Sequence, residues 1–347
     1  MASTIADVAR RAGVSTATVS RVLSGVGRAR PETRERVLDA ARALEFRPSL
    51  VARSLKQRVT RTLGLIVTDI ENPYFPQLVR AVEDAANAEG YAILLCNANE
   101  DPEREATYLD VLVERRVDGM IVAASTIGTR QQEWLAHPPV PVVLVNTGAG
   151  QVDLPSVASD NRAGGRLAAR HLLELGHRRF GYLMPPPRNV DAPNRVAGVR
   201  DELARHDREH PAGEQTSLSI ADGGPTVAGG EAATDDLLAA AVRPTALVAY
   251  NDLMAIGALR AIRRAGLRVP GDVSLVGFDD VAFAAYAEPA LTTVRQETAE
   301  MGRWAVAHLT ERLSGRATTE PPSRIVLPVH LEVRASTGPA PSQVLPT

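Results

Sequence analysis

Four polar side chains in this sequence each stand directly after an apolar run. The runs are TLGLIVT, VPVVLV, PTALVAY and VSLVGF, and the residues that follow them are Asp69, Asn146, Asn251 and Asp279. Carboxylates accept hydrogen bonds from hydroxyl groups, and amides both accept and donate them. If the runs are parallel strands, their carboxyl ends meet at one sheet edge, where open sheets bind ligands. These residue types therefore suit a sugar or a similar polar molecule.

Two further carboxylates, Asp252 and Asp280, stand next to this set and allow two interpretations. Each could contact a ligand at the same sheet edge. Each also stands where a helix begins, and a carboxylate there commonly accepts a hydrogen bond from the backbone N–H groups of the first turn. Both interpretations remain open for these two residues.

A second group of polar side chains lies near the N-terminus. The sequence TATVSRVL predicts a helix over residues 16–23 that turns Val19, Val22 and Leu23 inward. The outer face then carries Thr16, Ala17, Thr18, Ser20 and Arg21. Hydroxyl and guanidinium groups can hydrogen-bond the phosphates and base edges of DNA. This face also lacks the Glu–Lys pairs of a helix that is only solvated.

Another short helix precedes this one and would position it. Its apolar stripe, with the period of a helix, consists of Ile5, Val8, Ala9 and Ala12. Gly13 permits the left-handed backbone that ends a helix, and Ser15 can cap the next one. Two short helices joined by such a turn form a helix-turn-helix, whose second helix enters the DNA major groove. A helical hairpin without a DNA-binding role is the alternative.

The charge distribution favours the DNA-binding interpretation. Residues 1–58 carry seven more basic than acidic side chains, whereas the whole chain has a net charge of −2. A basic head on an acidic body is the asymmetry expected of a protein with a DNA-binding head.

The segment after the helix-turn-helix predicts a third helix and a linker. Pro31 can open this helix, which we expect to bury Val37, Leu38, Ala41 and Leu44. The preceding loop, residues 25–30, is basic and could contact the DNA backbone. Residues 50–56, LVARSLK, form too short a helix to be stable alone, so they could fold on DNA or against a second copy. A plain linker is the alternative.

From Thr62 onward, apolar runs alternate with segments of helical period. This alternation indicates βαβ units and parallel sheets. The pattern starts again after SVASDN, residues 156–161, which predicts two consecutive halves. We therefore expect an α/β fold with two lobes, each a doubly wound parallel sheet. The late segments 292–313 and 324–334 should cross back, one to each lobe.

Composition and missing motifs exclude several classes of protein. Cys96 is the only cysteine, so no internal disulfide can form. The N-terminus lacks the apolar region of a secretory signal, and no apolar run approaches the roughly 20 residues of a membrane span. These features predict a cytoplasmic protein and argue against a transport-type solute-binding protein. No nucleophile-elbow, zinc-protease or phosphate-loop motif is present, so we expect no enzyme, cofactor or metal.

The motifs DVARRAGVSTATVSRVL and TRERVLDAARALEFRPSLVARSL resemble the LacI/GalR family of bacterial transcription repressors, and NDLMAIGA, VGFDD and RVAG match its effector-site motifs. The resemblance covers nearly the whole chain. It implies a helix-turn-helix head over 1–48, a hinge helix and linker over 49–60, and a periplasmic-binding-protein-like effector and dimerisation domain over 61–338. Lobe 1 would span about 61–160 and 292–320, and lobe 2 about 161–291 and 321–338. Residues 339–347, rich in proline, should be a disordered tail.

The resemblance also assigns site residues. The hinge helix would pair with its dimer mate in the minor groove, where Leu55 wedges between central bases and Ala52 faces the groove floor. The expected DNA-binding residues are Thr4, Ser15, Thr16, Ala17, Thr18, Ser20, Arg21, Arg28, Ala52 and Leu55. The expected effector-binding residues are Asp69, Tyr74, Phe75, Asn146, Arg195, Asn251 and Asp279, with Arg188 as a further candidate.

We therefore expect a homodimeric repressor that binds double-stranded, pseudo-palindromic operator DNA and responds to a sugar-like effector. Effector binding would close or reorient the two lobes. This would shift the separation of the hinge segments, so that the hinge helices form or melt, which is an allosteric coupling. A corepressor-dependent repressor that responds to a nucleobase-like or phosphorylated metabolite is the alternative, and activation stays open. Residues 221–230 lack the aromatic lid of several family members, so either the effector is not stacked from that side or Phe75 alone stacks on it. His171 and His177 resemble a structural motif of the family, and we expect them to pack rather than react.

Overall fold

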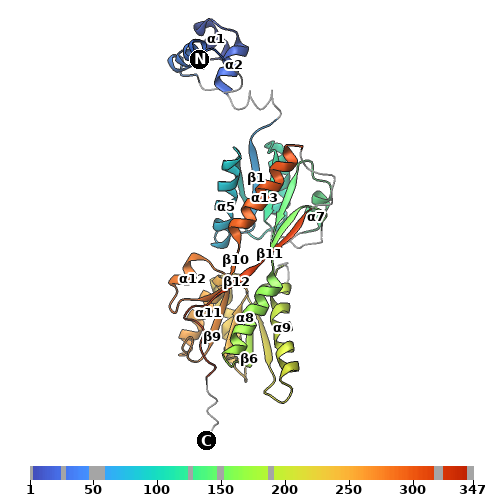
Figure 1. The fold of residues 1–347 in the computed structure, drawn as a ribbon. Helices are drawn as coiled ribbons and strands as arrows, with labels where there is room; N and C mark the ends of the chain where they lie inside the picture. The colour runs from blue at the N-terminus through green and yellow to red at the C-terminus, as the bar shows by residue number, and fades with distance from the viewer. Residues whose placement is uncertain are drawn as a thin grey trace. The chain divides into compact units, whose positions relative to one another are not determined.

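The computed structural model describes residues 3–24, 29–46, 59–123, 128–146, 152–186, 191–315 and 323–341. The chain divides into two units, Met1–Thr60 and Arg61–Thr347 (Figure 1). Among the described residues, no helix is long and apolar enough to cross a membrane.

The first unit is a three-helix head made of α1 (Ile5–Ala12), α2 (Thr16–Ser24) and α3 (Pro31–Ala43). Thr4 and Asp7 form a capping box at the start of α1, and Gly13 ends that helix with a left-handed φ of +64°. The core contains Val8, Ala9, Ala12, Val19, Val22, Val37, Ala40 and Ala41. The helix-turn-helix prediction is therefore confirmed in its elements and in the inward face of α2.

Two apolar residues expected on the inner faces of the head helices are exposed, Ile5 of α1 at 37% and one residue of α3. Leu38 is 37% exposed, and α3 buries Ala40 instead. The helical period allows either residue on the inner face, since both stand within one turn of the buried Val37 and Ala41. Contact with α1 and α2 decides between them, and the smaller alanine permits the closer approach.

The second unit contains two six-stranded sheets, one in each lobe. The lobe 1 sheet has the order β11-β5-β4-β3-β1-β2 and is entirely parallel. Its strands are β1 (Thr62–Val67), β2 (Ala92–Asn97), β3 (Gly119–Ala123), β4 (Val142–Val145), β5 (Ser156–Ser159) and β11 (Arg324–Leu327). The lobe 2 sheet has the order β12-β10-β9-β8-β6-β7, in which only β12 is antiparallel. Its strands are β6 (Arg179–Met184), β7 (Ser217–Asp222), β8 (Ala246–Ala249), β9 (Ser274–Asp279), β10 (Thr292–Gln296) and β12 (Val329–Glu332).

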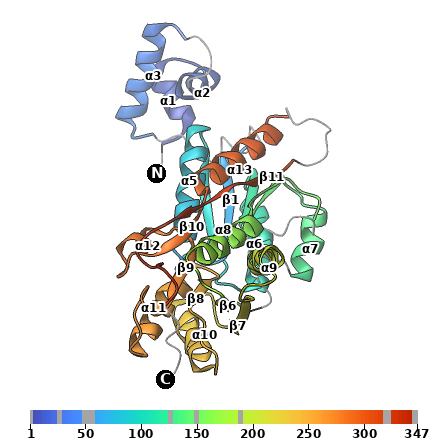
Figure 2. The same ribbon diagram turned by 60° about the horizontal axis from the view of Figure 1, so that its bottom comes forward.

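Helices cover both faces of each sheet. In lobe 1 they are α5 (Tyr74–Ala88), α6 (Pro102–Glu114), α7 (Thr129–Ala136) and α13 (Thr298–Leu313), with α5 packed beside α13 on one face (Figure 1). In lobe 2 they are α8 (Asn161–Glu174), α9 (Ala192–Glu209), α10 (Val227–Ala239), α11 (Asp252–Arg264) and α12 (Ala282–Tyr286). There α8 packs on α9 and α10 packs on α11 (Figure 2). The predicted two-lobed α/β fold is therefore confirmed.

The predicted lobe boundaries near the C-terminus need correction. Residues 292–296 form β10, which pairs with β9 in lobe 2, whereas residues 324–327 form β11, which pairs with β5 in lobe 1. The expected assignment, with 292–320 in lobe 1 and 321–338 in lobe 2, is therefore wrong for these two strands. The strand pattern of a segment predicts that it pairs but not with which sheet, because long-range packing selects the partner.

The predicted disordered tail also begins too early. The backbone N–H of Ala340 donates to the carbonyl of Leu175 at 2.8 Å, so the chain still packs on lobe 2 at that point. The described part of the chain ends at residue 341. Residues 342–347 of the predicted tail lie outside it.

Candidate functional site

The outer face of α2 carries the side chains predicted to contact DNA. Thr16, Ala17 and Arg21 are exposed, while Thr18 and Ser20 are half-buried. Ser15 accepts a hydrogen bond from the backbone N–H of Thr18 at 3.2 Å, so it caps α2 as expected. The head thus presents a short, polar and basic helix face, which suits insertion into a DNA groove.

Thr4 has a structural role in addition to the predicted one. Its hydroxyl donates to the Asp7 carboxylate at 2.7 Å and accepts from the Asp7 backbone N–H at 3.3 Å. Three of the predicted DNA-binding residues, Arg28, Ala52 and Leu55, lie outside the described residues, as does the effector candidate Arg188.

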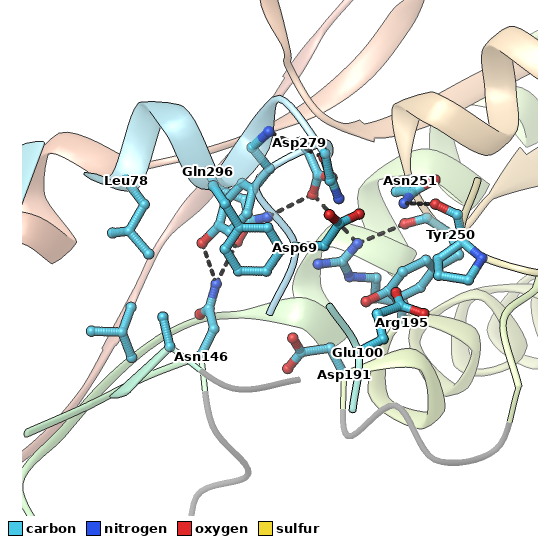
Figure 3. A pocket seen from close by; sticks show the side chains of 16 residues that line it. Asp69, Leu78, Glu100, Asn146, Asp191, Arg195, Tyr250, Asn251, Asp279 and Gln296 are labelled. Atoms are coloured by element: carbon cyan, nitrogen blue, oxygen red, sulfur yellow. Dashed lines mark hydrogen bonds and ion pairs between the residues drawn. The ribbon is translucent and has the colours of Figure 1, made fainter. Parts of the chain in front are cut away.

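A pocket in the second unit brings together all seven predicted effector-binding residues (Figure 3). Lobe 1 contributes Asp69, Tyr74, Phe75 and Asn146, and lobe 2 contributes Arg195, Asn251 and Asp279. The carboxyl ends of the strands in both sheets meet here. The pocket lining also includes Glu100, Asp191, Pro225, Tyr250 and Gln296, which the sequence analysis did not select.

Arg195 is the most constrained side chain of the pocket. Its guanidinium donates to the carbonyl of Tyr250 at 2.6 Å and to the side chain of Asn161 at 2.7 Å. The same group lies over the Phe278 ring, 3.7 Å from its centre, and over the Tyr250 ring at 4.5 Å. Packing on two rings fixes the planar group in one orientation, which favours recognition of a ligand oxygen.

Asp279 completes a buried ion pair with Arg195. Its Oδ1 lies 3.5 Å from Nη1 of Arg195, and the two side chains are 5% and 4% exposed. Burial raises the pKa of Asp279 to about 6 and has the same effect on Asp191 across the pocket. Because buried ion pairs rarely stabilise a fold more than apolar residues would, this pair points to a binding role.

Gln296 links the two lobes at the pocket. It stands at the end of β10 in lobe 2, and its Nε2 donates to Asp279 at 2.7 Å. Its Oε1 accepts from Ser159 Oγ at 2.6 Å and from Asn146 Nδ2 at 3.2 Å, and both donors belong to lobe 1. The sequence analysis missed Gln296 because the strand TTVRQ is not an apolar run. Its position at a strand end is the signal that could have identified it.

Tyr74 and Phe75 form the aromatic part of the lobe 1 wall. Their rings meet edge to face, with centres 5.2 Å apart. The Tyr74 hydroxyl accepts from Asn146 Nδ2, and burial raises its pKa well above 10. On the lobe 2 side, the segment without the expected aromatic lid contributes Pro225, whose carbonyl accepts from Asn251 Nδ2 at 3.0 Å.

The two carboxylates left open in the sequence analysis serve structural roles. Asp252 is fully buried and accepts from the Thr293 hydroxyl at 2.6 Å and the Val281 backbone N–H at 2.9 Å. Asp280 forms an ion pair with Arg334 at 2.6 Å. Neither lines the pocket. Asn251, by contrast, both lines the pocket and caps α11 through the Met254 backbone N–H at 2.8 Å.

These two units define a class of protein. A helix-turn-helix head combined with a two-lobed domain that encloses a polar pocket is the architecture of a ligand-responsive, DNA-binding transcriptional regulator.

Comparison with known proteins identifies the family. Residues 4–49 match the description "Bacterial regulatory proteins, lacI family", and residues 169–337 match "Periplasmic binding protein-like domain". A transcriptional repressor of Mannheimia succiniciproducens, PurR, is 37% identical over 313 residues, which are 90% of this chain and 92% of that protein. The chain belongs to the LacI family, and it is a transcriptional regulator rather than an enzyme.

Solved structures agree with this assignment. The Lac repressor dimer bound to operator and the anti-inducer ONPF has a TM-score of 0.86 and 30% identity, with coverage of 97% of this chain and 100% of that one. The transcriptional regulator CelR in complex with cellobiose has a TM-score of 0.71 and 33% identity, with coverage of 96% and 99%.

Proposed function

We propose that this protein is a homodimeric transcriptional repressor that acts in the cytoplasm, binds a pseudo-palindromic operator and is controlled by a neutral, sugar-like effector. The observation that carries the proposal is the pocket itself. Seven polar and aromatic residues predicted from the sequence line one cavity, and they come from both lobes. A ligand that contacts both lobes favours one arrangement of the lobes over another, and control of DNA binding by a ligand requires such a change.

The head supports the DNA-binding part of the proposal. The exposed hydroxyl, methyl and guanidinium groups of α2 suit hydrogen bonds to base edges and phosphates. A two-fold dimer would place two such helices on two half-sites, which explains a pseudo-palindromic operator. The relative from Mannheimia succiniciproducens is a transcriptional repressor, and the solved Lac repressor is a dimer bound to its operator.

The charges of the pocket favour a neutral effector. Asp69, Asp191 and Asp279 line it, and the charge of Arg195 is engaged by Asp279. An anionic phosphate would meet repulsion from these carboxylates, whereas hydroxyl groups can donate to them. The cellobiose in the CelR structure is a neutral sugar of this kind. A sugar therefore suits this pocket better than a phosphorylated metabolite does.

A nucleobase is the second candidate effector. Phe75 and Tyr250 present aromatic rings to the pocket, and a flat heterocycle could stack on such a ring while its N–H groups donate to Asp279. The name PurR belongs to a relative that is 37% identical. A bound nucleobase would make the protein a candidate for corepressor-dependent control.

Effector control would act through the polar contacts between the lobes. Gln296 connects Asp279 in lobe 2 with Asn146 and Ser159 in lobe 1. A ligand hydroxyl that competes for Asp279 weakens this link and favours a different arrangement of the lobes. The ligand shifts the population only by its difference in affinity for the two arrangements.

The test begins with a thermal-shift screen of the purified protein against sugars, polyols, sugar phosphates and nucleobases. A ligand that binds only the folded state raises the midpoint by mass action. The hit is then added to a fluorescence anisotropy titration with an operator selected in vitro from random double-stranded DNA. Weaker binding identifies an inducer, and tighter binding identifies a corepressor.

Asp279→Asn is the control for this experiment. We expect it to abolish the effect of the ligand while effector-free DNA binding is retained. A response that survives this substitution would remove Asp279 from the effector site. A screen in which only anionic sugar phosphates bind would contradict the neutral-effector proposal.

A further inference from the structure

The carboxylate that anchors the effector pocket stands on strained backbone. Asp279 has a φ of +113° and Asp280 a φ of +52°, a range that residues other than glycine rarely adopt. Such strain persists only where surrounding contacts hold the backbone in place, and it often marks a functional site. The contacts that hold this turn are therefore of functional interest.

Arg334 provides one of these contacts through an ion pair. Its guanidinium donates to Asp280 Oδ1 at 2.6 Å and to the carbonyl of Leu291 at 2.8 Å. The side chains of Arg334 and Asp280 are 23% and 16% exposed, so water screens the ion pair only in part. Arg334 itself does not line the pocket.

Arg334 can hold the turn because its own backbone is held. Its N–H donates to the Thr292 hydroxyl at 2.9 Å, and the next N–H, of Ala335, donates to the Ala290 carbonyl at 2.9 Å. Two residues on, Ser336 Oγ donates to the Leu275 carbonyl at 2.6 Å. The guanidinium therefore extends from a fixed segment that bridges β9 and β10.

We propose that Arg334 is a positioning residue for effector recognition, which holds the strained turn through Asp280 and so keeps the Asp279 carboxylate against Arg195 and Gln296. The function of Asp279 in this inference rests on the proposed function, whereas its placement by Arg334 does not. The C-terminal segment thus contributes to ligand affinity without touching the ligand.

The test compares Arg334→Gln and Arg334→Lys with the matched control Arg268→Gln. Arg268 is also in lobe 2 and pairs with an aspartate, Asp272, at 3.1 Å, but it is 79% exposed and remote from the turn. The lysine variant keeps a positive charge for Asp280 but loses the hydrogen bond to the Leu291 carbonyl. We therefore expect its effects on Asp279 to be smaller than those of Arg334→Gln.

The first readout requires no ligand. The protein is labelled with ¹³C at the aspartate carboxyl carbons, and the Asp279 signal is assigned by its loss in Asp279→Asn. In the unsubstituted protein this carboxyl should titrate near pH 6, as the raised pKa of Asp279 indicates. In Arg334→Gln the Asp279 carboxylate loses part of its contact with Arg195 and Gln296, the two groups that lower its pKa, so the midpoint should rise above pH 6, with no change in Arg268→Gln.

The second readout is affinity for the sugar found in the thermal-shift screen, with D-ribose and cellobiose as the first probes. We expect Arg334→Gln to bind at least about tenfold more weakly, Arg334→Lys to be intermediate, and operator affinity without sugar to stay within about twofold. An unchanged titration of Asp279, or a changed titration with unchanged sugar affinity, would overturn the role of Arg334. A changed titration in a protein that binds no sugar would support the positioning role and count against the sugar effector.

Discussion

Among single residues of the pocket, two carboxylates have pKa values that burial raises towards neutral pH. Asp279 and Asp191 both have a pKa raised to about 6 because they are desolvated. A hydroxyl group binds better to a carboxylate than to a carboxylic acid, since only the ionised form is purely an acceptor. The ionisation of these two groups should therefore be visible in ligand binding.

We expect effector affinity to rise with pH and to level off above about pH 7. If one group of pKa about 6 must be ionised for binding, only about one tenth of the protein is in the binding-competent form at pH 5. The Kd should therefore be about tenfold higher at pH 5 than at pH 7.5. Isothermal titration calorimetry at both pH values measures this directly. Affinity that is equal at pH 5 and 7.5 would mean that the ligand does not depend on these carboxylates.

His177 has a structural role, in agreement with its interpretation as a packing residue. It is fully buried, and its ring nitrogens contact Thr245 at 2.9 Å, Ser274 at 3.0 Å and the carbonyl of Gly338 at 3.1 Å. Burial lowers its pKa below the ordinary 6.5. As pH falls through 6.5, the unfolded chain therefore takes up a proton before the folded protein does, and the free energy of unfolding decreases.

This predicts a test by urea unfolding at pH 7.5 and pH 5.5. The unsubstituted protein should lose stability at the lower pH, and His177→Gln should reduce proton uptake on unfolding by up to about one proton. The free energy of unfolding of His177→Gln should still depend on pH to some extent, because the pKa values of His171 and His206 are also lowered. A variant with the same pH dependence as the unsubstituted protein would show that His177 does not contribute.

The site residues were predictable where they follow apolar strands or match a motif. Asp69, Asn146, Asn251 and Asp279 were found in this way. Gln296 was not, since its strand is polar, and Asp191 follows a segment without strand character. Asp252 shows the opposite error that is possible. It also follows an apolar strand, yet it binds backbone, and its position in the sequence cannot distinguish this structural role from contact with a ligand.

At the scale of elements, close contact between α8 and α9 sets the depth of Arg195 in the pocket. A Cβ atom added at Gly165 would lie 2.0 Å from the carbonyl oxygen of Arg195, and one added at Gly198 would lie 2.0 Å from that of Arg162. The two helices therefore meet backbone to backbone, at a distance that only glycine permits. Any side chain at this crossing would move α9 and the guanidinium it carries.

Gly165→Ala should accordingly destabilise the protein and weaken effector binding. Overpacking at a rigid contact typically costs about 1–3 kcal/mol, which urea unfolding can measure. Gly271→Ala is the control, because a Cβ there has only Arg268 side-chain atoms near it, at 3.6 Å. A Gly165→Ala variant as stable as this control would show that α8 and α9 can separate without cost.

The elements themselves were mostly predictable, since strands and helices follow local hydrophobic periods. The lobe to which β10 and β11 each belong could not be predicted. A strand pairs with residues far away in sequence, as Thr292 does with Val276, and the local pattern does not identify such a partner. The burial of Leu38 was wrongly predicted for a related reason, because packing against α1 and α2, and not the helical period of α3, decides which residue is buried.

At the scale of the whole molecule, exposed aromatic side chains on α12 suit the proposed dimer. Tyr286 is 86% exposed and Phe283 is 61% exposed in the single chain. Tyrosine and phenylalanine are enriched in protein interfaces, where they bury a large apolar area. A second copy seated on this helix would cover both.

Tyr286→Asp should raise the dimer dissociation constant at least about tenfold, equivalent to about 1.4 kcal/mol. Sedimentation equilibrium over a range of concentrations measures this constant. Val242→Asp is the control, as Val242 is 66% exposed in the same lobe but distant in sequence from α12. Equal effects of the two substitutions would place the dimer contact elsewhere.

The crossing of the chain between the lobes has a consequence for synthesis of the protein. Lobe 1 begins at β1, yet its sheet is completed by β11 and one face is covered by α13, and both elements follow nearly all of lobe 2 in sequence. Nascent lobe 1 on the ribosome therefore exposes the apolar face that α13 will cover until nearly the whole chain has emerged. The three-helix head, whose contacts are local, needs no such delay, so it should fold before the second unit is complete.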